Sequence, residues 1–292
     1  MTKIICMQRH YKLFKSPPNN RKICNITSPI QSFPSKVDLS PNMPPPLDQL
    51  NLGACASNAA SNIIRYLQKK ENIPEIQPSR LYLYWNTRVN IEGNSPNEDS
   101  GVCIRDICKA IKDYEACDET IWPYDITKFS HSPPLEAYKK ADLYSFIKYA
   151  YVPQDLNCVK SMLSTGNPLL IALQIFTSFE SDEVAKTGIV PIPDLRHETS
   201  MGWHAIILTG YDDETKMFTC LNSWGSWGKN GFCKIPYAYI LDNFLAGDFW
   251  VISLTKKNYL DKNYLDKTNM DNNMDNECPT DEPCNDCKDY EE

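Results

Sequence analysis

The sequence predicts an α+β protein of two lobes, with a helical first half and a β-rich second half. Two stretches before residue 141, at 56–67 and 104–114, carry apolar residues at three- and four-residue steps, which is the period of one helix face. After residue 141 the apolar residues come in short runs bounded by proline, glycine or asparagine, as is typical of strands. The change of period therefore divides the chain into two parts of different secondary structure.

Taken in order, the chain begins with an arm at 1–36 that has no helical period and is interrupted by prolines. Residues 37–46 are a stiff, proline-rich approach to the helix that starts near Cys55. Further helices are expected at 78–89, 104–114 and 155–164, with loops over 115–140. The expected strands are 143–152, 169–176, 203–211, 217–222, 231–235 and 248–254.

The composition is that of a globular protein with a substantial core, because 42% of the 292 residues are hydrophobic and 23% are charged. A net charge of −7 offers no basic surface of the kind that nucleic acid needs, so we expect no nucleic-acid partner. No apolar run approaches the roughly 18 residues of a membrane span, and the N-terminus lacks the apolar stretch of a secretory signal. We therefore expect a cytoplasmic or virion-associated protein without a membrane partner.

Twelve cysteines are spread along the chain, and without a secretory signal we expect most of them to be free thiols. The last three, Cys278, Cys284 and Cys287, lie in an acidic and repetitive stretch, 256–292, which we expect to be a disordered tail. A zinc site there needs a fourth ligand, and no histidine lies nearby. We therefore expect no metal, and a zinc-binding module built on these cysteines is left as an alternative.

Cys55 stands at or just before the first turn of the small-residue helix. The unpaired N–H groups and the dipole of a helix favour negative charge at that point. We therefore expect the pKa of this thiol to be lowered, which would favour the nucleophilic thiolate. Taken alone, a cysteine in such a position is more often a small buried hydrophobic residue, so the case for chemistry depends on its partners.

A cysteine nucleophile needs a base, and His204 stands at the head of an apolar strand. Asn222 opens an Asn-Ser-Trp-Gly run that follows His204 at a distance suited to an antiparallel hairpin. The amide oxygen of Asn222 would then accept the proton of one imidazole nitrogen, and the other nitrogen would face the thiol. The three residues therefore predict a site for nucleophilic catalysis by cysteine.

These segments resemble the papain family of cysteine peptidases. The helix start of the family, Gln-x5-Cys, is matched by Gln49 and Cys55. Its histidine strand is matched by Gly202-x-His204-Ala205, and its Asn-Ser-Trp-Gly signature by the run from Asn222. The resemblance is greatest to compact members that lack both the long helical pro-segment and the disulfide framework. It implies a papain-like peptidase domain at 37–255, with the helical lobe at about 47–140 and a β-barrel-like lobe at about 141–255.

Carried over by position, the resemblance makes Cys55 the nucleophile, His204 the general acid and base, and Asn222 the residue that orients His204. Gln49 would donate its side-chain amide to the oxyanion, together with the backbone N–H of Cys55. The substrate-binding positions that it implies are Ser100, Gly101, Trp203 and Trp224, the last of which would also cover the Asn222–His204 pair. The implied activity is hydrolysis of a protein or peptide substrate through a Cys55 thioester, by a monomer without a cofactor.

Two positions depart from the family pattern near the nucleophile. Leu50 replaces the usual glycine after Gln49, and Ala56 replaces the usual aromatic residue after Cys55. A catalytically silent papain-like binding or structural protein is therefore kept as an alternative. A transglutaminase-like enzyme is a further alternative, but such enzymes usually orient histidine with aspartate and not with asparagine. The arm at 1–36 is too short for a helical pro-segment, and our hypothesis is that it nonetheless lies in the cleft and blocks it.

Overall fold

The computed structural model describes residues 9–16 and 32–257. The chain separates into two compact units, residues 1–256 and 257–292. The acidic tail with its three cysteines and most of the N-terminal arm lie outside the described residues, so the predictions for them stay predictions. The helices and strands described all belong to the first unit.

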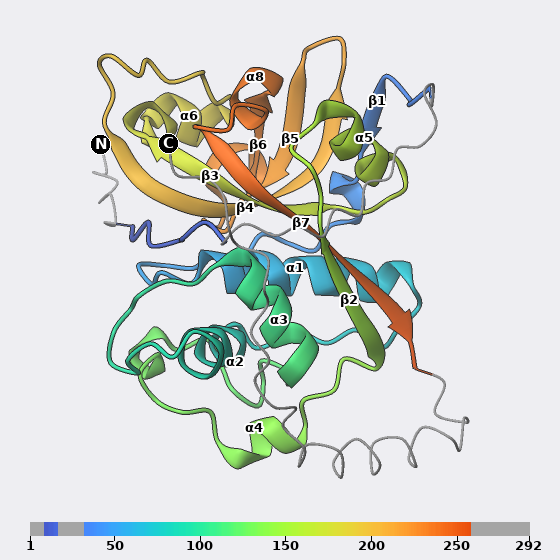
Figure 1. Cartoon of the computed structure of the whole chain (residues 1–292), viewed down its shortest axis with the longest axis vertical. Coiled ribbons are helices and arrows are strands. Elements are labelled where there is room, and N and C mark those ends of the chain that lie inside the picture. Colours follow the sequence, from blue (N-terminus) through green and yellow to red (C-terminus); the bar gives the residue numbers. More distant parts are fainter. Residues whose placement is uncertain (1–8, 17–31, 258–292) are drawn as a thin grey trace, which may run out of the picture. The chain divides into compact units, whose positions relative to one another are not determined.

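Helices form one side of this unit and a single sheet forms the other (Figure 1). The longest helix, α1 (Cys55–Lys70), runs along the boundary with the sheet. On the helical side are α2 (Arg80–Trp85), which continues into a π-helical turn, η2 (Asn86–Ile91), then α3 (Ile104–Tyr114) and α4 (Leu135–Lys139). The arrangement is an α+β fold, as the sequence predicts.

The sheet is antiparallel throughout the described residues, and its strands follow the order β2-β7-β3-β4-β5-β6, with β1 paired to β4. The strands are β1 (Lys36–Asp38), β2 (Ser145–Tyr151), β3 (Leu169–Phe176), β4 (Ser200–Asp212), β5 (Met217–Leu221), β6 (Phe232–Pro236) and β7 (Ala246–Lys256). The short helices among and after them are α5 (Leu156–Ser164), α6 (Asp182–Thr187), α7 (Trp227–Asn230) and α8 (Tyr237–Ile240). The remaining turns are the 3-10 helices η1 (Ser40–Asn42), η3 (Ile126–Lys128) and η4 (Thr177–Glu180).

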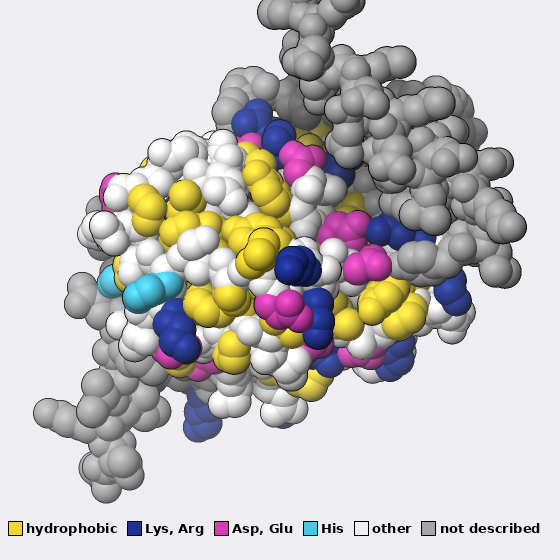
Figure 2. All heavy atoms as spheres, turned by 90° about the horizontal axis from the view of Figure 1, so that it is seen from below, with side chains coloured by type: hydrophobic (Ala, Val, Ile, Leu, Met, Phe, Trp, Pro, Cys, Tyr) yellow, Lys and Arg dark blue, Asp and Glu magenta, His cyan; other side chains and the backbone are white. Residues whose placement is uncertain are grey.

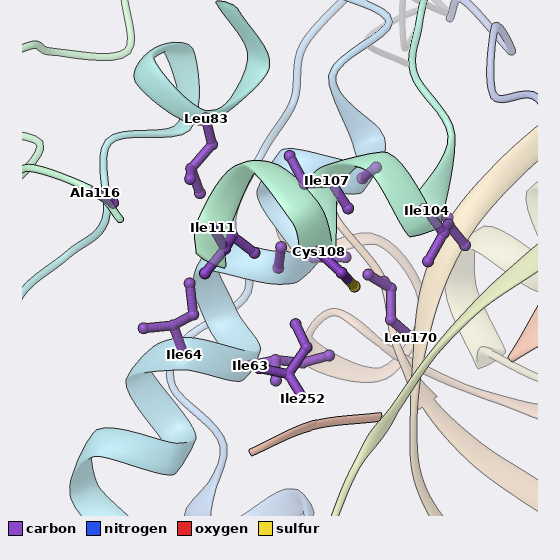
Figure 3. Close-up of a cluster of buried hydrophobic side chains, with 14 of the residues drawn as sticks. Ile63, Ile64, Leu83, Ile104, Ile107, Cys108, Ile111, Ala116, Leu170 and Ile252 are labelled. Atoms are coloured by element: carbon purple, nitrogen blue, oxygen red, sulfur yellow. The ribbon is translucent and has the colours of Figure 1, made fainter. Parts of the chain in front are cut away.

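The core has two parts, one on each face of the sheet. Strand β3 contributes to both, because successive side chains of a strand point to opposite faces. Leu170 packs with the helices, whereas its neighbours Leu169 and Ile171 pack into the cluster on the other face. Figure 3 shows the first cluster, in which Ile63 of α1 and Ile252 of β7 point toward one another beneath α3. The helices are therefore fixed to the sheet through apolar contacts of α1 and α3.

Most of the predicted elements are found with small shifts of their ends. The strand at 169–176 and the helix at 104–114 occur with the predicted bounds, and Asp155 caps α5 by accepting the backbone N–H groups of Asn157 and Cys158. The single helix expected at 78–89 is wrong in its second half, because α2 gives way to the η2 turn. There Asn86 donates its side-chain amide to the carbonyl four residues back, which competes with the helical bonding pattern.

One further expectation needs correction. Residues 36–38, placed in the irregular arm and its stiff continuation, form strand β1 because they pair with β4. The stretch 115–140 is rich in loops, as predicted, and also contains the short helices η3 and α4. These elements are only three to five residues long and are held by their neighbours, so they leave little periodic signal in the sequence.

The surface of the helical side mixes charges of both signs with scattered hydrophobic side chains (Figure 2). Among the described cysteines, Cys55, Cys103, Cys108, Cys117, Cys220 and Cys233 are free thiols, as the sequence predicts for most of the twelve. No helix in the described part of the chain is long and apolar enough to cross a membrane.

The packing of α1 gives a first prediction. Replacing Ile63, which is fully buried, by alanine should lower the free energy of unfolding by about 2–5 kcal/mol, because the lost side chain leaves a cavity between α1 and the sheet. Urea denaturation of the full chain measures this. The matched control is Ile189→Ala, because Ile189 is 48% exposed and its truncation should cost less than about 0.5 kcal/mol. Equal losses for the two variants would contradict the described core.

Candidate active site

Cys55 is the first residue of α1, and its side chain is buried. Burial raises the pKa of the thiol, and the backbone N–H groups of Cys55 and Ala56 at the helix start oppose that rise, as expected at a helix N-terminus. The backbone N–H of Ala205, on β4, acts in the same direction. The thiol therefore lies where the start of α1 meets the strand residue that follows His204.

The predicted lowering of the Cys55 pKa is nevertheless wrong for this structure. Burial outweighs the backbone N–H groups and raises the pKa of the thiol to about 11. Burial likewise lowers the pKa of His204 to about 4, against the opposing effect of its hydrogen bond to Asn222. Both groups are therefore neutral at pH 7 in the buried state described here.

His204 lies on β4 and is fully buried, and its Nε2 atom is 2.8 Å from the Oδ1 atom of Asn222. Since an amide oxygen can only accept, Nε2 carries the ring proton in this pair. The Nδ1 atom has no hydrogen-bond partner among the described residues. The structure thus brings His204 and Asn222 together as predicted and leaves one imidazole nitrogen ready to accept a proton.

Trp224 covers the imidazole, as the resemblance implies. The two ring centroids lie 4.9 Å apart, with 33° between the ring planes. Trp224 is itself held at the edge of Phe179 and against Trp227. This aromatic group excludes water from the His204–Asn222 hydrogen bond, which strengthens that bond.

Gln49 is buried in a turn before α1 and links the two halves of the site. Its Oε1 atom accepts a hydrogen bond from the hydroxyl of Ser223 at 2.8 Å, and its Nε2 atom donates to the carbonyl of Leu52 at 3.1 Å. Nε2 carries two hydrogens, so one of them is left for another acceptor. Leu50 has a φ of 57°, a conformation that favours glycine, so the substitution noted in the sequence places strain beside Gln49.

The turn that carries Gln49 is held by two residues that sequence reasoning did not assign to the site. Arg80 donates to the backbone carbonyl of Asp48 at 3.1 Å and pairs with Glu119 at 2.7 Å. The hydroxyl of Tyr124 donates to the Gln49 carbonyl at 3.0 Å, and the Arg80 guanidinium stacks on the Tyr124 ring. Arg80 is a positioning residue, and a lone arginine in a predicted helix gave no signal of that role.

Ser100 and Gly101 lie on the wall of the site opposite Trp203. Gly101 has a φ of +74°, and a Cβ atom there would come within 1.8 Å of the carbonyl oxygen of Lys12. The hydroxyl of Ser100 donates to the carbonyl of Gly101, so it points along its own loop. Trp203 forms a parallel bridge with Lys12. Both predicted substrate-binding walls thus contact the same short piece of the N-terminal arm.

That piece, residues 9–16, is called the N-terminal segment below, and it crosses the site in an extended conformation between the helices and the sheet (Figure 1). Tyr11 places the edge of its ring against His204 and Trp224, each at 6.1 Å between centroids. The side chain of Leu13 is buried in the core cluster of the helical side. Tyr11 therefore contributes to the burial that keeps His204 neutral, and the charge of Arg9 lowers the pKa of His204 further.

One group of possible metal ligands, Glu92, Cys103 and Asp106, occurs among the described residues, with ligand atoms within 4.8 Å of one another. Each already has a protein partner: Glu92 accepts the backbone N–H of Cys103 at 2.7 Å, and Asp106 pairs with Arg105 at 3.0 Å. Burial raises the pKa of the Cys103 thiol to about 12, away from the thiolate that binds metals. We assign no metal or cofactor to these residues.

Comparison with known proteins agrees with this geometry. The model of the Peptidase_C39 like family matches residues 43–252. An "uncharacterized peptidase C1-like protein" of Acanthamoeba polyphaga mimivirus is 40% identical over 216 residues, which cover 70% of this chain and 68% of that protein. The chain belongs to the papain-like cysteine peptidases.

A solved structure agrees with this family. This papain-like peptidase resembles xylellain, a cysteine protease from Xylella fastidiosa, with a TM-score of 0.75 and 32% identity over 84% of this chain and 96% of that one. Digestive procathepsin L 3 of the Tenebrio molitor larval midgut has a TM-score of 0.59 and 17% identity, over 78% of this chain and 72% of that one. This second likeness supports the fold alone.

The burial of the site gives a prediction for pH. His204 should be neutral at pH 7, with its proton on Nε2, and should become charged only as the pH falls toward about 4, because burial disfavours the imidazolium. NMR of the ring nitrogens in the full chain measures the charge and the tautomer. The control is Cys55→Ser, which should leave the His204 signals at pH 7 unchanged. An imidazolium at pH 7 that this substitution makes neutral would instead reveal a thiolate–imidazolium pair.

Proposed function

We propose that this papain-like protein is an active peptidase that hydrolyses peptide bonds through a thioester on Cys55. The observation that carries the proposal is the orientation of His204, whose Nε2 is held by Asn222 while Nδ1 has no described partner. The thiol of Cys55 lies at the adjacent backbone of β4. A nucleophile, a base and an orienting group are therefore present in one buried site.

In the proposed reaction the Nδ1 atom of His204 accepts the proton of the Cys55 thiol, and the sulfur attacks the carbonyl carbon of the peptide. The resulting oxyanion accepts hydrogen bonds from the backbone N–H of Cys55 and from the second amide hydrogen of Gln49. His204 then gives its proton to the leaving amine, and the thioester remains. A water molecule, deprotonated by His204, attacks the thioester and releases the acid and the free thiol.

This mechanism draws every reacting group from one chain. Cys55, His204, Asn222 and Gln49 all lie in the first unit, so a monomer without a cofactor suffices for the proposed reaction. A protein or peptide is the substrate that the mechanism requires. The mimivirus relative supports a virion-associated setting for this enzyme.

The proposed roles predict distinct losses of activity. Cys55→Ser should abolish peptide hydrolysis, and Gln49→Ala should lower kcat by about 10² or more, because an oxyanion donor is lost. The assay combines turnover of a fluorogenic peptide mixture with labelling by an epoxysuccinyl inhibitor, mapped by mass spectrometry. Cys158→Ser, on α5, is the matched control for a buried cysteine and should keep both signals. Absence of hydrolysis and of any Cys55 adduct, also after removal of residues 1–36, would favour the silent binding or structural protein.

We also propose that the N-terminal segment inhibits this enzyme by occupying its substrate path. A Cβ atom at Gly202 would lie 2.6 Å from the carbonyl oxygen of Tyr11, and a Cβ atom at Gly101 would meet the carbonyl oxygen of Lys12. The segment is therefore packed closely between the two walls. A peptide substrate cannot enter while the segment is there. The segment must leave, and solvent that then reaches Cys55 and His204 would reduce the burial that keeps them neutral.

The burial of Leu13 provides a test of this inhibition. Leu13→Asp should displace the N-terminal segment, because an unpaired carboxylate is costly to bury, and should raise the rate of epoxysuccinyl labelling of Cys55 by about tenfold or more. The neighbouring Phe14 is 57% exposed, so Phe14→Asp is a matched control that should leave the rate unchanged. Equal rates for the wild type and both variants would show that the segment does not limit access to the thiol.

A further inference from the structure

Basic side chains of the N-terminal segment meet two acidic side chains of the cleft. Arg9 lies 3.3 Å from a carboxylate oxygen of Glu180, and His10 lies 3.0 Å from one of Asp99. Lys12 lies 3.7 Å from the same Asp99 carboxylate and donates to its backbone carbonyl at 2.5 Å. Each carboxylate thus receives a basic side chain from the peptide that crosses the site.

The two carboxylates stand on opposite walls. Glu180 ends η4 on the sheet side, where it also accepts the hydroxyl of Tyr11, and Arg9 stacks over the ring of Trp224 at 4.2 Å. Asp99 lies on the helical side, in the loop just before the Ser100 and Gly101 wall. Because alternate side chains of an extended peptide point in opposite directions, residues 9 and 11 face Glu180 while residues 10 and 12 face Asp99.

Asp99 is held in place by the body of the enzyme and not by the segment alone. Its carboxylate accepts the hydroxyl of Tyr84 at 2.5 Å and the backbone N–H of Gly53 at 3.1 Å. Gly53 precedes Cys55 by two residues, and the charge of Asp99 acts on the Cys55 thiol. These bonds do not involve the N-terminal segment, and they keep Asp99 oriented toward the cleft when the segment leaves.

We infer that Glu180 and Asp99 are specificity-determining residues that make the cleft select peptides with adjacent basic residues, one cation for each wall. This inference rests on the proposed peptidase function. A pair of neighbouring Lys or Arg residues in an extended substrate would place one side chain at Glu180 and the other at Asp99, as Arg9 and His10 do in the segment. The segment is then a model of the preferred ligand.

The full-length enzyme can be tested with three quenched fluorogenic peptides that differ only in one central pair of residues: Lys-Lys, norleucine-norleucine or Glu-Glu. Norleucine keeps the aliphatic stem of lysine and removes its charge. The ratio of kcat/KM for two peptides on one enzyme does not depend on the fraction of molecules that have released the segment. We expect the Lys-Lys peptide to be preferred over norleucine by about tenfold or more, with a smaller ratio at high salt.

Substitutions of Glu180 and Asp99 test whether these two residues cause the preference for the Lys-Lys peptide. Glu180→Gln and Asp99→Asn should each reduce the ratio of kcat/KM between the Lys-Lys and norleucine peptides. The double variant should bring this ratio close to one. Glu180→Lys should raise the relative rate of the Glu-Glu peptide, which a loss of folding would not do. The control is Glu183→Gln, which removes an exposed carboxylate of α6 from the same region and should keep the wild-type ratio.

A wild-type ratio near one, with all three peptides hydrolysed, would overturn the inference and leave the proposed peptidase function intact. A wild-type preference that survives in the double variant would overturn the assignment to Glu180 and Asp99. No hydrolysis of any peptide, together with no epoxysuccinyl adduct on Cys55 in the wild type and in Leu13→Asp, would overturn this inference and the proposed function together.

Discussion

The close packing of the start of α1 against strand β4 is the constraint on which the rest of the site depends. Ala56 and Ala205 are both buried at this contact, and their small side chains let the helix N-terminus approach the strand backbone. Cys55 and His204 precede these two alanines in the chain. Ala56, which replaces the family's usual aromatic residue after Cys55, is fully buried at this contact.

Burial at this contact has opposite effects on structure and on reactivity. It protects the His204–Asn222 hydrogen bond beneath Trp224, and it also raises the pKa of the thiol and lowers that of the imidazole. A buried thiolate–imidazolium pair would have to be stabilised against the loss of hydration of both ions. The N-terminal segment contributes to this burial. The exposure of the site to water therefore affects both the access of substrate and the charge state of the nucleophile.

Support for the site comes largely from hydrogen bonds that join distant parts of the chain. Gln49 is tied to Ser223, Arg80 holds the backbone before α1, and Tyr124 donates to the carbonyl of Gln49. These contacts keep the turn at Leu50 in a strained conformation, since its positive φ is one that a leucine rarely adopts. Strain near a reacting group is tolerated where the surrounding structure fixes it.

The sequence by itself determined the α+β class, most of the elements, and the order and spacing of Cys55, His204 and Asn222, because periodicity and motifs are properties of neighbouring residues. Only the tertiary structure decided the charge state of the site, the course of residues 9–16 and the acidic walls that they meet. Arg9 and Glu180 are separated by 171 residues and His10 and Asp99 by 89, and no local pattern marks such pairs. Burial, which reversed the expected pKa of Cys55, depends on all of these long-range contacts together.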